Sequence, residues 1–198
     1  MTVQYQKTSS APYRAVIALH GWTGNADSMQ PVARALEISD TLWVFPQAPY
    51  SASSGGFSWY DGDKSSGWKY TASFSLIDKL LKEQFGNGFS ANKLYLLGFS
   101  QGASLVLEYM IRQRFSIAGV IAIAGFIHDK KKFIREIKQE SKGSRVLLIH
   151  GEKDQVIYPS ASEKVHKLLN ESGYQAELQI LPTSHKVSLN AKPLIKKF

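Results

Sequence analysis

The sequence predicts an α/β fold in which helices cover both faces of a mostly parallel sheet. Apolar runs of strand length alternate along the chain with longer stretches of helical period, the order that repeated strand–helix–strand units produce. Most of the strand-length runs are continuously apolar and rich in β-branched residues, as expected for strands buried on both faces. The 198 residues, 43% of them hydrophobic, suffice for one substantial core, so we expect a single domain over residues 1–198.

The predicted elements follow one another in regular alternation. Strands are expected at residues 15–19, 41–45, 94–98, 119–124, 146–149 and 177–181, and residues 3–6 are a candidate for an additional edge strand. Helices are expected at residues 29–36, 70–85, 101–114, 130–140 and 160–171. Residues 46–67 form an irregular stretch of glycine, serine and aromatic residues, and loops of this length in compact domains usually carry function.

The composition excludes several kinds of protein. The chain contains no cysteine, which excludes disulfides, thiolate metal sites and a cysteine nucleophile. Its first residues lack the apolar core of a signal peptide, and its longest apolar run, residues 117–127, is too short to cross a bilayer. We therefore expect a cytoplasmic protein without stable membrane insertion. Dinucleotide-binding and P-loop glycine patterns are absent, as is a His-Glu-x-x-His zinc helix.

A net charge of +8 raises the question of an anionic partner. The densest basic stretch, residues 130–142, places its cations near helical spacing with apolar residues between them, which indicates a solvated helix face. Weak attraction to anionic lipids or acidic partners is the alternative. No recognisable nucleic-acid-binding motif accompanies the charge, so no nucleic acid partner is expected.

The stretch Gly98-Phe99-Ser100-Gln101-Gly102 is the strongest local signal. It lies between an expected buried strand and an expected helix, so Ser100 stands on a tight strand-to-helix turn where flanking glycines relieve crowding. A Gly-x-Ser-x-Gly pattern in this context predicts a nucleophilic serine. The alternative is a plain tight turn.

Two later strands provide candidate partners for Ser100. Asp154 follows the strand at 146–149 and His185 follows the strand at 177–181, so both are expected at the carboxyl edge of the sheet. The chain order Ser, Asp, His is that of catalytic triads on such sheets, with His185 as the base and Asp154 as the acid that orients it. A solvated aspartate and a surface histidine are the alternatives, and Glu152 and Asp129 are fallback acids.

Donors for an oxyanion are expected from the backbone. The N–H group of Gln101 follows the nucleophile, and that of Trp22 lies in the loop after the first main strand, between Gly21 and Gly24. The remaining histidines are weaker candidates. His20 and His150 are expected to have structural roles, His166 to be exposed, and His128 to lie on the pocket rim.

These residues resemble a known family, the carboxylesterase and acyl-protein thioesterase group of the α/β-hydrolase superfamily, also called phospholipase/carboxylesterase. The resemblance covers nearly the whole chain. It is carried by Leu19-His20-Gly21-Trp22-Thr23-Gly24-Asn25, Pro46-Gln47-Ala48-Pro49, Trp59-Tyr60-Asp61, Gly98-Phe99-Ser100-Gln101-Gly102, His150-Gly151-x-x-Asp154 and His185. It implies an α/β-hydrolase fold without a large cap domain, a triad of Ser100, Asp154 and His185, hydrolysis of carboxylic esters or acyl thioesters, and no metal or organic cofactor.

The chain departs from the family pattern in several places. Ala103 stands where a third glycine is common, and Lys186 follows the base where an acidic or apolar residue is more usual. Few residues precede the first main strand, and Pro193 is expected to interrupt any helix after His185. We therefore expect a trimmed sheet of six or seven strands instead of the eight of the parent fold.

The loops at the expected carboxyl edge contain many apolar residues. Trp22, Phe57, Trp59, Phe126 and Ile157 are the candidate substrate contacts, with Tyr60, Trp68, Ile127 and Tyr158 as further candidates. Anchoring of the loops is the alternative role for such aromatics. The favoured function is hydrolysis of small carboxylic esters through an acyl-enzyme. Acyl thioesterase and lysophospholipase are the alternatives, and a non-catalytic binding protein on the same fold is the alternative of another class. A monomer or a homodimer is expected.

Overall fold

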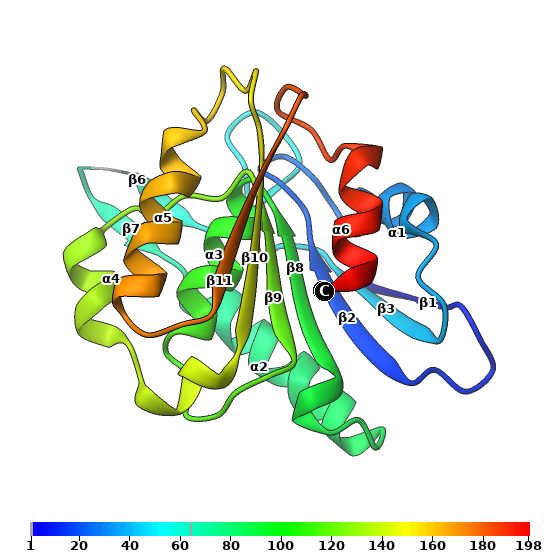
Figure 1. Cartoon of the computed structure of the whole chain (residues 1–198). Helices are drawn as coiled ribbons and strands as arrows, with labels where there is room; N and C mark the ends of the chain where they lie inside the picture. Colours follow the sequence, from blue (N-terminus) through cyan, green and yellow to red (C-terminus); the bar gives the residue numbers. More distant parts are fainter. Residues whose placement is uncertain (1, 64) are drawn as a thin grey trace.

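The computed structural model describes residues 2–63 and 65–198 and shows a central sheet with helices on both faces (Figure 1). The sheet has seven strands in the order β1-β3-β2-β8-β9-β10-β11. β1 pairs antiparallel with β3, and the other neighbouring strands pair in parallel. The predicted α/β class and the predicted sheet of six or seven strands are confirmed, with residues 3–6 inside the edge strand β1.

The elements have the following bounds. The sheet contains β1 (Val3–Lys7), β2 (Arg14–Leu19), β3 (Thr41–Pro46), β8 (Leu94–Phe99), β9 (Gly119–Ile123), β10 (Arg145–Gly151) and β11 (Ala176–Leu181). The helices are α1 (Gln30–Leu36), α2 (Thr71–Gly86), α3 (Gln101–Met110), α4 (Lys130–Glu136), α5 (Ser160–Glu171) and α6 (Lys192–Lys197), with 3-10 turns at Ala91–Lys93, Gln139–Gly143 and Leu189–Ala191. The described part of the chain has no helix that is both long and apolar enough to cross a membrane.

The sheet is buried on both faces because its strands are apolar at successive positions. Along β2, Ala15 and Ile17 belong to a core with α2, α3, α4 and α5, whereas Val16 and Ala18 belong to a second core with α1 and α6. Figure 1 shows α1 and α6 together on one face and the other helices on the opposite face. Because β2, β8, β9, β10 and β11 pair in parallel, their carboxyl ends lie at one common edge of the sheet. The loops that follow β2, β8, β10 and β11 therefore begin at this edge.

Three predictions of element boundaries are corrected by the structure. The helix expected at 130–140 ends at Glu136, because Ile137 adopts extended angles and a separate 3-10 turn follows. The helix expected at 101–114 ends at Met110. Pro193 occupies the first turn of α6 and does not interrupt it, since a residue at that position needs no N–H partner within the helix.

The long irregular segment after β3 is partly ordered into two small antiparallel hairpins. One pairs β4 (Tyr50–Ser51) with β5 (Phe57–Ser58), and the other pairs β6 (Asp61–Asp63) with β7 (Gly67–Lys69). Two hydrogen bonds tie the first hairpin to the loop after β2, from the Thr23 N–H to the Phe57 carbonyl at 2.9 Å and from the Phe57 N–H to the Gly24 carbonyl at 3.1 Å. This segment thereby lies over the carboxyl edge of the sheet.

Candidate active site

Ser100 occupies a strained turn between β8 and α3. Its backbone angles are φ 53° and ψ −115°, a region that residues with a side chain rarely adopt and that typically costs about 1–3 kcal/mol. The Ser100 N–H donates a hydrogen bond of 2.8 Å to the carbonyl oxygen of Ile123 at the end of β9. The turn is thus fixed against the neighbouring strand and holds the hydroxyl clear of its own backbone.

Close backbone contacts require both glycines that flank Ser100. A Cβ atom on Gly98 would lie 2.4 Å from the carbonyl group of Gly102. A Cβ atom on Gly102 would lie 2.5 Å from the carbonyl oxygens of Leu19 and His20. Neither position accommodates a side chain without movement of the backbone. Gly102 in particular allows α3 to begin directly against the end of β2.

Ser100, His185 and Asp154 lie in one line of hydrogen-bonding contacts. Ser100 Oγ is 3.0 Å from His185 Nε2, and His185 Nδ1 is 2.6 Å from Asp154 Oδ2. Each residue follows the carboxyl end of its strand, Ser100 after β8, Asp154 after β10 and His185 after β11. In this geometry an imidazole can accept a serine proton while a carboxylate holds the ring in the required tautomer.

The Asp154 carboxylate is buried, and both of its oxygens have polar partners. Its Oδ1 accepts the N–H groups of Val156 and Ile157, each at 2.9 Å, and its Oδ2 also lies 3.3 Å from His150 Nε2. Burial raises the pKa of Asp154, but the hydrogen bonds from His185 and then from the two backbone N–H groups outweigh burial and leave the pKa below its ordinary value. The carboxylate is therefore charged at neutral pH.

Gly151 allows the loop of His185 to pack against the loop of Asp154. A Cβ atom on Gly151 would lie 2.4 Å from the carbonyl oxygen of Thr183 and 2.5 Å from that of Ser184. We expect Gly151→Ala to displace His185 from Asp154, lowering kcat toward small esters by about a hundredfold and the free energy of unfolding by about 1–3 kcal/mol. Ester hydrolysis and thermal unfolding of the purified variant measure both effects.

Gly86→Ala is the matched control for this substitution. Gly86 ends α2, and a Cβ atom there would have no neighbour within 4 Å, so activity and stability should stay close to those of the parent chain. Parental kcat in a folded Gly151→Ala variant would show that the contact between the two loops does not position His185.

Two backbone N–H groups border Ser100 without a hydrogen-bond acceptor. Within residues 2–63 and 65–198, neither the Trp22 N–H nor the Gln101 N–H donates a hydrogen bond to the protein. Both residues line the hollow that contains Ser100. The two residues predicted to supply oxyanion donors thus border the same hollow as Ser100, and neither N–H group is engaged elsewhere in the described structure.

Three of the other histidines, His20, His150 and His166, form hydrogen bonds with residues other than Ser100. His20 is buried, with Nε2 accepting the Ala48 N–H at 3.1 Å and Nδ1 donating to the Gly21 carbonyl at 2.6 Å. Burial lowers the pKa of His20, so its ring is neutral. His150 Nδ1 contacts Ser162 Oγ at 2.6 Å. His166 is half-buried, contrary to the expected exposure, with Nε2 3.1 Å from the carbonyl oxygen of Ala176.

Ser100 opens into a hollow of about 590 Å³, which we call the active-site hollow. Of the predicted substrate contacts, Trp22, Phe126 and Ile157 line it, together with Tyr60, Trp68, His128 and Val156. A second hollow of about 380 Å³ lies on the His185 side and shares Trp22 as a wall; we call it the His185 hollow. An apolar hollow of about 450 Å³ shares Phe126, Val156 and Ile157 with the active-site hollow.

The prediction that Trp59 contacts substrate is wrong. Its side chain is fully buried, and its indole N–H donates to the His20 carbonyl oxygen at 2.8 Å. Phe57 also does not line the active-site hollow, because it packs against the core below the first hairpin. A tryptophan has both an apolar body and a polar N–H, so residue type alone did not distinguish a pocket wall from an anchor.

Two features of the site were missed from the sequence. The Gln101 side chain accepts the Trp59 N–H at 2.8 Å through Oε1, which ties α3 to the long loop. Glu108 lies buried under His128, with Oε1 3.6 Å from His128 Nδ1. A glutamate within the apolar run of α3 was the available signal, since a buried carboxylate requires partners.

Among the described residues, no group of three or more His, Asp or Glu side chains is arranged to hold a metal ion.

A family model for phospholipase/carboxylesterase proteins matches residues 3–198. The chain belongs to this family. It is 21% identical over 190 residues to the carboxylesterase SOBER1 of Arabidopsis thaliana, an alignment that covers 87% of this chain and 83% of the relative. It is 27% identical over 179 residues to acyl-protein thioesterase 1 of Cryptococcus neoformans, covering 81% and 74% of the two chains.

Solved structures that are similar to this chain have the same architecture. The crystal structure of esterase PE8 is 25% identical and superposes with a TM-score of 0.85, covering 100% of this chain and 95% of the other. That of SOBER1 is 20% identical, with a TM-score of 0.82 and coverage of 93% and 96%. The chain therefore has the α/β-hydrolase fold without a large cap. As a member of this family it is an ester or thioester hydrolase that acts on small ester or acyl substrates.

Proposed function

We propose that this chain is a serine carboxylesterase that works through a triad of Ser100, His185 and Asp154. The observation that carries the proposal is the continuous line of contacts from Ser100 Oγ through the His185 ring to Asp154, at 3.0 and 2.6 Å. The strained turn at Ser100 supports the same role, because it exposes the hydroxyl at the base of the active-site hollow.

In the proposed first half-reaction, Ser100 Oγ attacks the acyl carbon while its proton passes to His185 Nε2. Asp154 stabilises the imidazolium through Nδ1–H, and the N–H groups of Trp22 and Gln101 bind the oxyanion of the tetrahedral intermediate. The C–O bond to the alcohol then breaks, and His185 returns its proton to the leaving oxygen. Water, deprotonated by the same ring, hydrolyses the acyl-enzyme and restores the serine.

The positions of the hollows support a proposal for where the two parts of an ester bind. His185 must protonate the departing alcohol, so the alcohol belongs in the His185 hollow, which His185 lines. The acyl part then extends into the active-site hollow, beside the two N–H donors, and an apolar chain can continue toward the apolar hollow past Phe126 and Ile157. An acyl thioesterase is the second candidate, because similar proteins include acyl-protein thioesterase 1 and a thiol can leave by the same route.

Labelling with a fluorophosphonate probe tests the proposal. We expect covalent modification of one residue, Ser100, because the probe reacts with serines activated by an adjacent base. Mass spectrometry of peptides identifies the modified residue. A well-folded chain that remains unlabelled would support the non-catalytic binding protein, and labelling at another serine would overturn the assignment of the nucleophile.

A separate comparison of rates shows whether the chain prefers an alcohol or a thiol as the leaving group. Rates for 4-nitrophenyl esters across a series of acyl lengths, measured beside an acyl thioester of matched length, give the ratio of esterase to thioesterase efficiency. The carboxylesterase proposal expects the ester to have the higher kcat/KM after correction for the intrinsic reactivity of the two substrates.

A further inference from the structure

A further hollow, with a polar lining, adjoins the active-site hollow and lies between α3, α4 and the hairpin of β6 and β7. Its volume is about 590 Å³, and we call it the basic hollow. Its polar lining consists of Glu108, Arg112, His128, Asp129, Lys130, Lys131 and Lys132. Tyr60, Trp68 and His128 line both hollows. These three rings therefore form a wall common to both hollows, which an acyl chain attached to Ser100 has to cross to reach the basic hollow.

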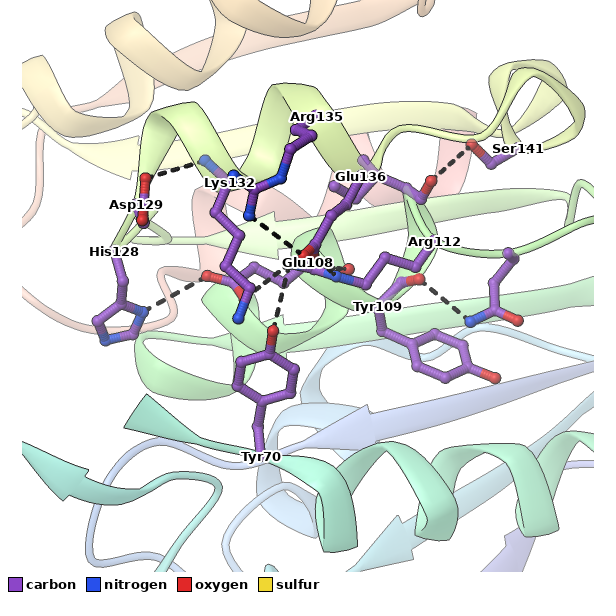
Figure 2. A network of polar contacts seen from close by, with 12 residues as sticks. Tyr70, Glu108, Tyr109, Arg112, His128, Asp129, Lys132, Arg135, Glu136 and Ser141 are labelled. Carbon is purple, nitrogen blue, oxygen red and sulfur yellow. Dashed lines mark hydrogen bonds and ion pairs between the residues drawn. The ribbon is translucent and has the colours of Figure 1, made fainter. Parts of the chain in front are cut away.

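The carboxylates at this hollow already have partners. Glu108 lies between Arg112, at 3.6 Å, and His128, at 3.6 Å (Figure 2). Arg112 is also held by Glu136 of α4, with an Nε to Oε2 distance of 2.6 Å. Asp129 accepts the backbone N–H of Lys132 at 2.9 Å as the cap of α4. The network fixes Arg112 and His128 in place without using the lysines.

The three lysines have no carboxylate partner. In the described part of the chain, none of Lys130, Lys131 and Lys132 forms an ion pair. Lys132 is half-buried, and its Nζ lies 4.9 Å from the centroid of the Tyr70 ring. A hydrogen bond with the Tyr70 hydroxyl raises the pKa of Lys132, so the ammonium group stays charged. The four cations that line this hollow are thus balanced by Glu108, Asp129 and the Glu136 that holds Arg112, which leaves a small excess of positive charge carried by the lysines.

The wall shared by the two hollows contains polar atoms without a hydrogen bond to any described residue, although His128 Nδ1 keeps its 3.6 Å ionic contact with Glu108. The buried Tyr60 hydroxyl and His128 Nδ1 form no hydrogen bond in the described structure. The His128 ring packs against Tyr60 at 4.7 Å, Trp68 at 4.9 Å and Phe126 at 4.7 Å between ring centroids. Buried polar atoms of native proteins are usually satisfied, and a bound polar ligand is one way to satisfy them.

We propose that the basic hollow binds a carboxylate at the far end of the acyl chain, so that the preferred substrates are esters of dicarboxylic acids in which one acid group remains free. The proposal rests on the function proposed above, because it assumes an acyl group attached to Ser100. The free carboxylate belongs to the acyl part of the ester, since the alcohol departs on the His185 side. Lys131 and Lys132 supply the positive charge, and His128 lies in the wall that the acyl chain crosses between the two hollows. Neutral chains use the apolar hollow instead.

Matched pairs of activated esters test this specificity. The anionic members are 4-nitrophenyl hydrogen succinate, adipate and suberate, and the neutral members are 4-nitrophenyl butyrate, hexanoate and octanoate, which have the same carbon numbers. The measured quantity is the ratio of kcat/KM for the anionic ester to that for its neutral partner. We expect this ratio to rise above one at the length that brings the carboxylate to Lys131 and Lys132, and to fall as salt is added.

Removal of the two lysines should abolish the preference. In Lys131→Gln/Lys132→Gln, the ratio should drop by about tenfold, as for loss of charge partners at a partly buried site, while kcat/KM for the neutral esters stays near the parental value. The matched control is Lys79→Gln/Lys82→Gln, which removes the same charge from the exposed side of α2 and should change the ratio by less than about twofold.

A binding measurement separates this proposal from the proposed function. In Ser100→Ala, which cannot form an acyl-enzyme, monomethyl adipate should bind more tightly than methyl hexanoate, and the two lysine substitutions should remove that difference. Equal ratios in the parent and the lysine variant, or a ratio below one at every chain length, would overturn the carboxylate site while leaving the esterase intact. Failure of every ester to react, with selective binding retained, would instead overturn the proposed function.

Discussion

The Ser100→Ala variant is expected to lose about a million-fold in kcat toward 4-nitrophenyl butyrate, the loss seen when the nucleophile of a serine triad is removed. The hydroxyl is the group that forms the covalent bond to the acyl carbon in the proposed mechanism, and neither water nor His185 can replace it at that point. Residual hydrolysis would come from the Trp22 and Gln101 donors and from substrate binding. Steady-state rates at high enzyme concentration measure the loss.

Folding must be shown to survive this substitution. Alanine at position 100 has to adopt the same positive φ as serine, so the free energy of unfolding should change little. Ser75→Ala on the exposed face of α2 is the matched control and should retain parental kcat. A folded Ser100→Ala variant with parental rates would refute the nucleophile assignment outright.

The Asp154→Asn variant is expected to lose about ten-thousand-fold in kcat, as in other triads that carry this substitution. The amide oxygen can still accept the two N–H groups of Val156 and Ile157, which directs the NH₂ group toward His185. His185 Nδ1 must then accept a hydrogen bond, which places the ring proton on Nε2. A protonated Nε2 cannot take the proton of Ser100.

Asp40→Asn provides the control for the loss of one carboxylate. Asp40 is exposed and has a positive φ that asparagine also tolerates, so kcat and stability should remain parental. The measurement is kcat for 4-nitrophenyl butyrate at neutral pH, where Asp154 is charged. A loss smaller than about tenfold would mean that another acid, such as Glu152, orients the ring.

The arrangement of the sheet was predictable because the parallel strands are buried on both faces. Strand β9, most of β8 and the stretch of β10 between Arg145 and His150 are apolar at successive positions, the pattern of strands buried on both faces. The meeting place of Ser100, Asp154 and His185 followed from the same reasoning, since residues after parallel strands share one edge. The local sequence pattern around Ser100 and the order of the strands point to the same edge of the sheet. For that reason one sequence was enough to predict that these three residues lie together.

Features that depend on tertiary contacts were not predictable in the same way. The burial of Trp59 depends on a carbonyl of His20, thirty-nine positions away. The link from Glu136 through Arg112 and Glu108 to His128 joins two helices and a loop. Glu108 and Arg112 have the i,i+4 spacing of helical neighbours, but no periodicity in the sequence encodes the contacts of Arg112 with Glu136 or of Glu108 with His128. The early end of α4 at Glu136 has the same cause, because the following segment is tied to α3 by a bond from the Lys138 N–H to the Ile111 carbonyl at 2.8 Å.

The position of β11 at the edge of the sheet has a consequence for how activity and folding are linked. Among the strands that the structure describes, this strand pairs only with β10 and all of its residues are half-buried or exposed, whereas most residues of β8 in the middle of the sheet are buried. Edge elements with few buried contacts open at a lower free energy than the centre of a domain. We therefore expect the region of His185 to open at a lower free energy than that of Ser100, so that partial opening would remove the proposed base while most of the fold persists.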